Sequence, residues 1–145
     1  MSFQHQLTVR FFDVDPVGIV FFGRVFQYCH EAWEELLASA FGDAREFFEH
    51  SPWGFPLVHV ESDYERPMRV AERLTVRVEL DRVGTRSLTF VHTITGSDGA
   101  VRARCKLVHA AVDRATFQPI AVPREFVDGL TRLGLVAREL GDQRS

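Results

Sequence analysis

The sequence feature that most constrains the fold is an apolar periodicity that runs from Phe22 to Ala40. Its members recur at spacings of three and four residues: Phe22, Val25, Phe26, Cys29, Ala32, Trp33, Leu36, Leu37 and Ala40. This spacing predicts an α-helix of about five turns. Because the apolar face is broad and aromatic, we expect the helix to lie in the core, covered by other elements.

The segments on both sides of this helix have the two-residue period of β-strands. Residues 6–12 alternate apolar and polar side chains up to a final pair of phenylalanines, which predicts one strand before the helix. Four more strands are predicted after it, at residues 57–65, 74–80, 87–95 and 101–112. Ser97-Asp98-Gly99 is typical of a hairpin turn between the last two. Long strands joined by tight turns indicate an antiparallel sheet.

Turn and cap residues divide the remaining chain. Gly42 is expected to end the long helix, and Asp43 to cap a short second helix that runs through Phe48. Pro123 suits the first turn of a final amphipathic helix that ends at Leu133. With no βαβ alternation and no internal repeat, this order predicts an α+β fold, a five-stranded antiparallel sheet wrapped around one central helix.

Length and composition agree with one globular domain over residues 1–145. A chain of 145 residues buries most of its apolar surface without disulfides or structural metals. Its 46% hydrophobic and 26% charged residues are near the average for globular proteins, which argues against disorder. Cys29 and Cys105 fall on apolar faces, so two buried free thiols are favoured over a bridge.

Charge and hydropathy restrict the partners and the compartment. The net charge of −3, without any run of Lys or Arg, argues against nucleic acid as a partner. The first residues lack the pattern of a signal peptide, and no apolar stretch approaches the ~20 residues of a membrane-spanning helix. We therefore expect a cytoplasmic protein with no membrane partner.

The turn between the first strand and the long helix carries the candidate chemistry. It reads Asp13-Val14-Asp15-Pro16-Val17-Gly18. A helix start offers unpaired N–H groups and positive partial charge, which polarise a thioester carbonyl. A carboxylate on the other side of that carbonyl can attack it or activate water. The same residues are also ordinary turn formers, so the spacing alone leaves both interpretations open.

A resemblance to a known family favours the catalytic interpretation. Residues 12–22, Phe-Asp-Val-Asp-Pro-Val-Gly-Ile-Val-Phe-Phe, are similar to the signature of the 4-hydroxybenzoyl-CoA thioesterase family. The similarity covers about residues 6–112. Residues 26–34, 55–59 and 72–74, with Pro67, particularly resemble its 1,4-dihydroxy-2-naphthoyl-CoA thioesterases. The resemblance implies a hot-dog fold, a homodimer or a dimer-of-dimers homotetramer with active sites between subunits, an acyl-CoA substrate, and neither metal nor separate cofactor.

The same resemblance assigns the catalytic groups. The family's catalytic aspartate matches Asp15, as nucleophile or general base. Its oxyanion donor, a backbone N–H at the start of the helix, matches Phe22, and the Gly23 N–H lies next to it. Related acyl-CoA thioesterases often carry His or Tyr at the position of Phe22. A backbone role is therefore expected here and a side-chain role is not.

Four substrate-binding residues are suggested as well. Arg86 and Ser87 match the turn that holds CoA phosphates in the family, although Gly84 and Thr85 replace residues that are basic in some relatives, and a solvated Arg at a strand end is the alternative. His59 matches a position that lines the acyl pocket, with a hydrogen-bonded core histidine as the alternative.

On the long helix, His30 and Glu31 diverge by ~100°, so at most one of them faces the substrate. His30 is preferred, because it follows the core position Cys29.

The spacing of the candidate ligands in the sequence does not match a known type of metal site. Asp13, Asp15 and Gly18 fit a calcium loop, but Val17 and Arg24 occupy positions that require oxygen ligands. The histidines of the strands, His59, His92 and His109, lack the local spacing of a zinc site.

The leading hypothesis is thus hydrolysis of an aromatic acyl-CoA. The alternatives are a thioesterase that acts on aliphatic acyl-CoA or on acyl groups held by a carrier protein, and a non-catalytic acyl-CoA binding module in which Asp15 only caps the turn.

Overall fold

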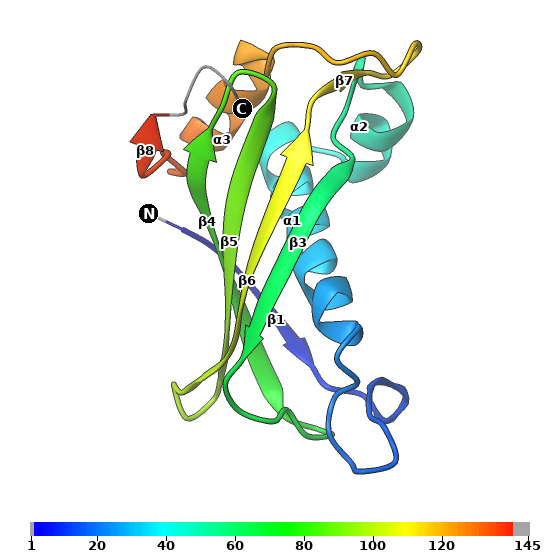
Figure 1. Ribbon diagram of the computed structural model, residues 1–145, viewed down its shortest axis with the longest axis vertical. Coiled ribbons are helices and arrows are strands. Elements are labelled where there is room, and N and C mark those ends of the chain that lie inside the picture. The colour runs from blue at the N-terminus through cyan, green and yellow to red at the C-terminus, as the bar shows by residue number, and fades with distance from the viewer. Residues whose placement is uncertain (1, 141–145) are drawn as a thin grey trace.

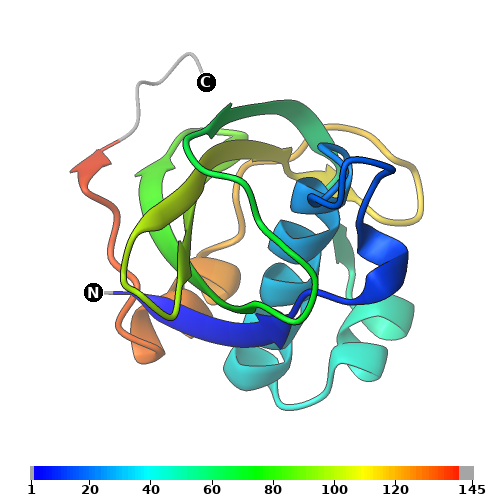
Figure 2. The same ribbon diagram turned by 90° about the horizontal axis from the view of Figure 1, so that it is seen from below.

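An antiparallel sheet curves around the long helix α1 (Arg24–Phe41), as Figures 1 and 2 show. The computed structural model describes residues 2–140. Met1 and residues 141–145, which the single-domain prediction includes, lie outside the described residues. Within them, no helix has the length and apolar character needed to cross a membrane.

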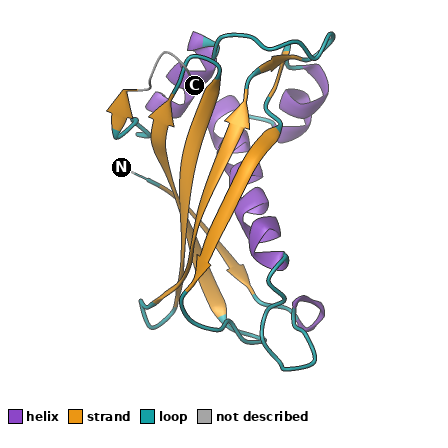
Figure 3. Ribbon diagram, viewed as in Figure 1, coloured by secondary structure: helices purple, strands orange, loops and turns teal. Residues whose placement is uncertain are grey.

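The main sheet has the strand order β1–β4–β5–β6–β3. Its strands are β1 (Phe3–Thr8), β3 (Leu57–Tyr64), β4 (Arg73–Val83), β5 (Ser87–Gly96) and β6 (Val101–Ala110). All four pairings along this path are antiparallel, which confirms the predicted five-stranded sheet. The short strand β8 (Glu139–Leu140) adds to β4 in parallel (Figure 3).

Smaller elements close one end of the sheet. Gly42 ends α1 with φ of 86°, a conformation that glycine adopts without steric cost, and its N–H donates to the Ala38 carbonyl at 2.8 Å. Asp43 caps α2 (Ala44–His50), as predicted, by accepting N–H bonds from its first turn. Strand β2 (Trp53–Gly54) pairs with β7 (Val112–Asp113), and α3 (Arg124–Arg132) follows Pro123.

The core forms where α1 meets the concave face of the sheet. The buried side chains of α1 are those of Val25, Tyr28, Cys29, Ala32, Trp33, Leu36 and Leu37. Trp33 stacks on His109 with ring centroids 4.2 Å apart and meets the edge of Phe90 at 5.1 Å. Burying one large apolar side chain contributes about 1.5–3 kcal/mol. The helix and the sheet therefore stabilise each other. Cys29 and Cys105 are buried and free, as predicted.

The first strand differs from its predicted range. It spans Phe3–Thr8 instead of residues 6–12, and Phe11–Asp13 form a 3-10 helix, η1. After the strand, the Val9 N–H donates to the Glu72 carbonyl, and the Val9 carbonyl accepts the Ala71 N–H. The chain therefore remains paired with the segment before β4. The chain then turns because the Asp13 carboxylate accepts the Arg10 N–H at 2.9 Å. Phe11 and Phe12 continue the apolar pattern in the sequence and so extend the predicted strand. In the structure both side chains are exposed and lie outside β1.

Two other predicted boundaries shift. Helix α1 begins at Arg24 rather than at Phe22, because Phe21 and Phe22 belong to the turn that precedes its N-cap Gly23. The predicted strand at 101–112 divides after Ala110. The chain leaves the main sheet there, since Val112 pairs with Gly54 of β2.

Two histidines are buried in the core. His92 of β5 is fully buried, and neither of its ring nitrogens has a hydrogen-bond partner among the described residues. Burial, reinforced by the charge of His109, lowers the pKa of His92 to about 3. Burial also lowers the pKa of His109 to about 4, although the bond of its Nδ1 to the Phe55 carbonyl opposes this shift. Both rings are therefore neutral in the folded protein at neutral pH.

These histidines make the folded state sensitive to acid. The unfolded chain protonates them near pH 6.5, so their contribution to stability is complete above that pH and falls as the pH decreases toward 4. Each contributes a slope of up to about 1.4 kcal/mol per pH unit. We expect His92→Leu to remove about half of the combined slope between pH 6.5 and 4, measured by urea unfolding. His50→Leu, at an exposed position, is the control, and equal slopes in both variants would contradict the assignment.

Candidate active site

Asp15 lies in a closed loop between η1 and α1. Val14 bridges to Val20, and the Asp15 N–H donates to the Ile19 carbonyl at 2.8 Å. Gly18 closes the loop by donating to the Asp15 carbonyl at 2.9 Å, with φ of 92°. The Asp15 carboxylate accepts the Val17 N–H at 2.8 Å. The carboxylate is therefore held at a fixed place and half-buried, with its second oxygen making no bond to another described residue.

Two neighbouring segments hold this loop against the rest of the fold. On one side, Ile19 bridges to Arg69, and the Val20 N–H donates to the Met68 carbonyl at 2.8 Å. On the other side, the Phe21 N–H donates to the Asp13 carbonyl at 2.9 Å. The buried Asp13 carboxylate accepts a backbone bond and faces the Arg24 guanidinium at 3.8 Å. Asp13 therefore helps to hold the loop in place.

A cavity of about 590 Å³ opens beside Asp15. It is lined by Asp15, Ile19, Val20, Phe21, Phe22, Tyr64, Glu65, Arg66, Pro67 and Met68. Among the described residues, the N–H groups of Phe22 and Gly23 donate to no protein acceptor. The structure therefore brings Asp15 and Phe22 to one cavity, with Gly23 next in the chain. Tyr64, whose hydroxyl donates to the Phe22 carbonyl at 2.7 Å, was not predicted from the sequence.

A second cavity, of about 290 Å³, lies farther along α1 and is mainly aromatic. Its lining includes His30, Trp33, Phe47, Trp53, Phe55, Leu57, His109 and Arg114. His30 thus faces a cavity, whereas Glu31 turns to the opposite side and bonds His5 at 2.5 Å. His109 was missed as a lining residue. The two-residue alternation along β6 could have indicated this position, because it places His109 on the core-facing side together with Cys105 and Leu107.

The other predicted substrate-binding residues lie apart from Asp15 within one chain. His59 is exposed on β3, with its Nε2 3.2 Å from Glu61, and lines neither cavity. Arg86 and Ser87 lie at the turn between β4 and β5, at the top of Figure 1, whereas the Asp15 loop is at the bottom. No group of three His, Cys, Asp or Glu side chains in residues 2–140 is arranged to hold a metal ion.

Comparison with known proteins places this geometry in a family. Residues 9–130 match the model of the thioesterase-like superfamily. The chain belongs to that superfamily. It is a thioester hydrolase. A relative named 1,4-dihydroxy-2-naphthoyl-CoA hydrolase, from Nostoc punctiforme, is 32% identical over 130 residues, which cover 90% of this chain and 87% of the relative.

Solved structures show the same fold. A 1,4-dihydroxy-2-naphthoyl-CoA thioesterase from Synechocystis aligns with a TM-score of 0.82 at 22% identity, over 94% of this chain and 100% of that one. A Staphylococcus aureus protein in complex with CoA aligns with a TM-score of 0.83 at 14% identity, over 100% and 92%. The hot-dog fold implied by the resemblance is therefore confirmed.

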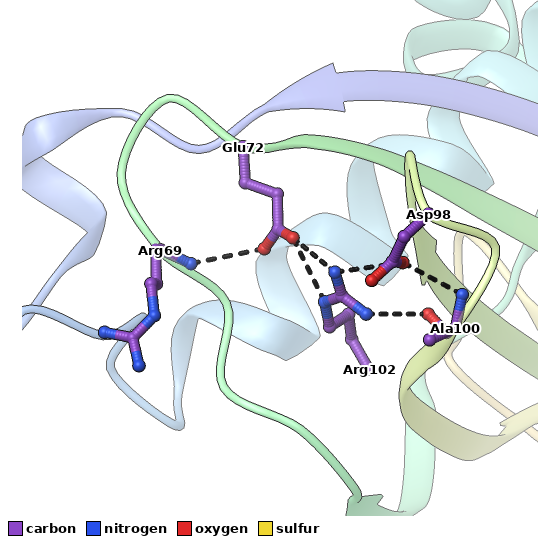
Figure 4. Close-up of polar contacts among 5 residues, drawn as sticks. All are labelled: Arg69, Glu72, Asp98, Ala100 and Arg102. Atoms are coloured by element: carbon purple, nitrogen blue, oxygen red, sulfur yellow. Dashed lines mark hydrogen bonds and ion pairs between the residues drawn. The ribbon is translucent and has the colours of Figure 1, made fainter.

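In this thioesterase a buried ion pair lies beside the turn at residues 69–72, which follows the cavity-lining residue Met68 (Figure 4). The Arg102 guanidinium donates through Nε to Glu72 at 3.1 Å and faces Asp98 at 3.1 Å. Glu72 accepts the Arg69 N–H at 3.3 Å, which closes the turn that pairs with Ile19. The Arg102 guanidinium also occupies the space beside Gly96, where an added Cβ would lie 2.3 Å from its Nη2.

Removing this buried charge should be costly. Arg102→Met leaves the Glu72 carboxylate without its cation, and we expect a loss of about 3–5 kcal/mol in the free energy of unfolding. The matched control is Arg104→Met, two residues along the same strand. The Arg104 side chain is 53% exposed against 8% for Arg102, and its pair with Glu65 is worth about 0–1 kcal/mol. Urea unfolding measures both; equal losses would show that Arg102 is not the anchor of this turn.

Proposed function

We propose that this thioesterase hydrolyses an aromatic acyl-CoA, of the 1,4-dihydroxy-2-naphthoyl-CoA or 4-hydroxybenzoyl-CoA type, to the free acid and CoA. The observation that carries the proposal is the cavity that Asp15 and Phe22 both line at the start of α1, where the N–H groups of Phe22 and Gly23 donate to no acceptor among the described residues. The relatives named 1,4-dihydroxy-2-naphthoyl-CoA hydrolases support the substrate class.

In the proposed mechanism the thioester carbonyl oxygen accepts the N–H groups of Phe22 and Gly23. Asp15 attacks the carbonyl carbon or removes a proton from the attacking water. The C–S bond then breaks, and the CoA thiolate leaves and takes up a proton. If Asp15 attacks directly, water then cleaves the resulting mixed anhydride and restores the Asp15 carboxylate; on either route one water molecule is consumed for each free acid formed. The apolar walls, among them Ile19 and Met68, strengthen the field of the donors by excluding water. One oxyanion donor of this kind is worth about 100–1000-fold in turnover.

The aromatic cavity suits the acyl group. Trp33 and Phe55 offer flat apolar surface, and His30 adds a polar group at the wall. In a single chain this cavity and that of Asp15 lie at different levels of α1. Leu57, at the start of β3, lines the aromatic cavity, and Tyr64, at the end of β3, lines the Asp15 cavity. The two ends of one strand therefore mark the two halves of the site.

A homodimer through β3 would unite these halves. β3 is the last strand of the sheet path, and its edge carries exposed Leu57, Val58 and Val60. An antiparallel two-fold pairing of β3 with its copy places the start of one strand beside the end of the other. The aromatic cavity of one chain would then adjoin Asp15 of its partner. His59 and the Arg86-Ser87 turn lie toward the same end of the chain as the aromatic cavity, so they would approach from the partner as well.

The assembly is tested at the edge strand. Val58→Lys places a charge on a side chain that is 62% exposed in the single chain, and we expect a monomer with little thioesterase activity. Val136→Lys is the control, because Val136 is 64% exposed but lies outside β3. Light scattering measures the mass, and hydrolysis of benzoyl-CoA the activity. A fully active monomeric variant would overturn the shared site.

The catalytic assignment is tested with Asp15→Asn, which keeps the shape and removes the charge. We expect kcat to fall by about 100-fold or more. Asp128→Asn, at an exposed position of α3 outside both cavities and outside β3, should hydrolyse at the wild-type rate. Undiminished turnover by the Asp15 variant would show that another group is the base or nucleophile.

A substrate panel tests the specificity of the wild type. Aryl and aliphatic acyl-CoA esters, and a carrier-protein thioester of the same aryl group, are compared by kcat/KM. The aromatic lining predicts the highest values for aryl-CoA. Binding of every ester without hydrolysis would instead identify a non-catalytic module.

A further inference from the structure

Tyr64 joins the edge of the sheet to the start of α1. It is the last residue of β3, and its ring lines the Asp15 cavity. Its hydroxyl donates to the Phe22 carbonyl at 2.7 Å, across a sequence separation of 42 residues. This bond is made to the turn that carries the two proposed oxyanion donors.

The bond determines where one of these donors points. The Phe22 carbonyl and the Gly23 N–H belong to the same peptide unit, which is trans, so the two groups point in opposite directions. A hydroxyl that holds the carbonyl on one side therefore directs the Gly23 N–H to the other side. A bond to the carbonyl also polarises the peptide and makes its N–H a stronger donor.

The neighbouring bonds show how much depends on Tyr64. The Phe21 N–H is held by Asp13 and the Phe21 carbonyl by the Arg24 N–H, both at 2.9 Å. The Phe22 carbonyl has one other bond among the described residues, from the Val25 N–H at 3.4 Å. That bond is long for an amide hydrogen bond. Without the Tyr64 hydroxyl, the peptide between Phe22 and Gly23 would thus be the weakly held part of the turn.

We propose that Tyr64 is a positioning residue for the oxyanion donors, acting through the Phe22 carbonyl. The inference rests on the proposed function, in which the N–H groups of Phe22 and Gly23 bind the thioester oxygen. The phenol proton is already donated to a carbonyl, so Tyr64 does not serve as the proton source for the leaving thiolate. Burial raises the pKa of Tyr64, opposed by a hydrogen bond with Ser62, so the hydroxyl remains a donor at neutral pH.

The kinetic test is Tyr64→Phe, which removes only the hydroxyl and keeps the ring in the cavity wall. We expect kcat for benzoyl-CoA to fall about 10-fold, a part of the effect of losing a whole donor, with KM changed less than about 2-fold. The control is Asp128→Asn on α3, outside both cavities and outside β3, with wild-type kinetics. A raised KM with unchanged kcat would show that Tyr64 only lines the cavity and would overturn the inference.

A spectroscopic test measures the donors directly. In the Asp15→Asn background the thioester persists, and the infrared stretch of its isotopically labelled carbonyl reports polarisation by the oxyanion donors. Adding Tyr64→Phe should reverse part of the lowering of that frequency on binding. This measurement is made on the folded complex, so it decides the question even if the substitution reduces stability.

The two proposals fail separately. Wild-type kcat and an unchanged carbonyl frequency in Tyr64→Phe would overturn the role of Tyr64 while Asp15→Asn remained inactive. Full hydrolysis by Asp15→Asn would instead overturn the proposed function itself, whatever the Tyr64 variant did.

Discussion

Everything in this structure depends on the burial of one face of α1 against the concave side of the sheet. Trp33, Leu36 and Leu37 are buried on the face of α1 that the sheet curves around, and Trp33 packs in addition against Phe55 and Phe126. That contact determines where the N-terminus of α1 lies, beside the end of β3 and the segment before β4. Phe22, whose N–H donates to no acceptor among the described residues, therefore lines a cavity that no local sequence rule could have placed.

The same interaction explains which polar groups the core tolerates. His92 and His109 lie on the sheet face that α1 covers, and their neutral state is a consequence of that burial. Arg102 remains charged because Glu72 and Asp98 surround its guanidinium where β4 begins and the hairpin between β5 and β6 turns. The histidines weaken the folded state in acid, whereas the ion pair holds the turn that supports the Asp15 loop. Buried polar groups thus have two different effects in one sheet.

Local periodicity predicted most of the fold. The long helix, the five strands and the caps at Gly42 and Asp43 follow from spacing and turn chemistry that act within a few residues. The first strand was placed too late because Phe11 and Phe12 continue an apolar pattern, while a backbone bond to the Asp13 carboxylate decides the turn. Exposed aromatic side chains at a site imitate core residues in the sequence, and only the packing distinguishes them.

The residues of the candidate site also divide into those that a short stretch of sequence contains and those that only long-range packing brings there. Asp15 was proposed from the turn before the helix, and Phe22 and Gly23 from the family resemblance; one short segment carries all three residues. Tyr64, Glu72 and Arg102 were missed because their contacts span 30 residues or more.

In a single chain, His59 and Arg86 lie far from Asp15 because β3 separates the two halves of the site by its full length. In the proposed site, a strand that ends at the Asp15 cavity and begins at the aromatic one gives the chain both halves but does not let it join them. In the proposed dimer, the length of β3 would determine the distance between the reacting carbonyl and the acyl pocket. Substitutions around Trp33 and Phe55 could then alter the acyl group accepted without disturbing the loop that holds Asp15.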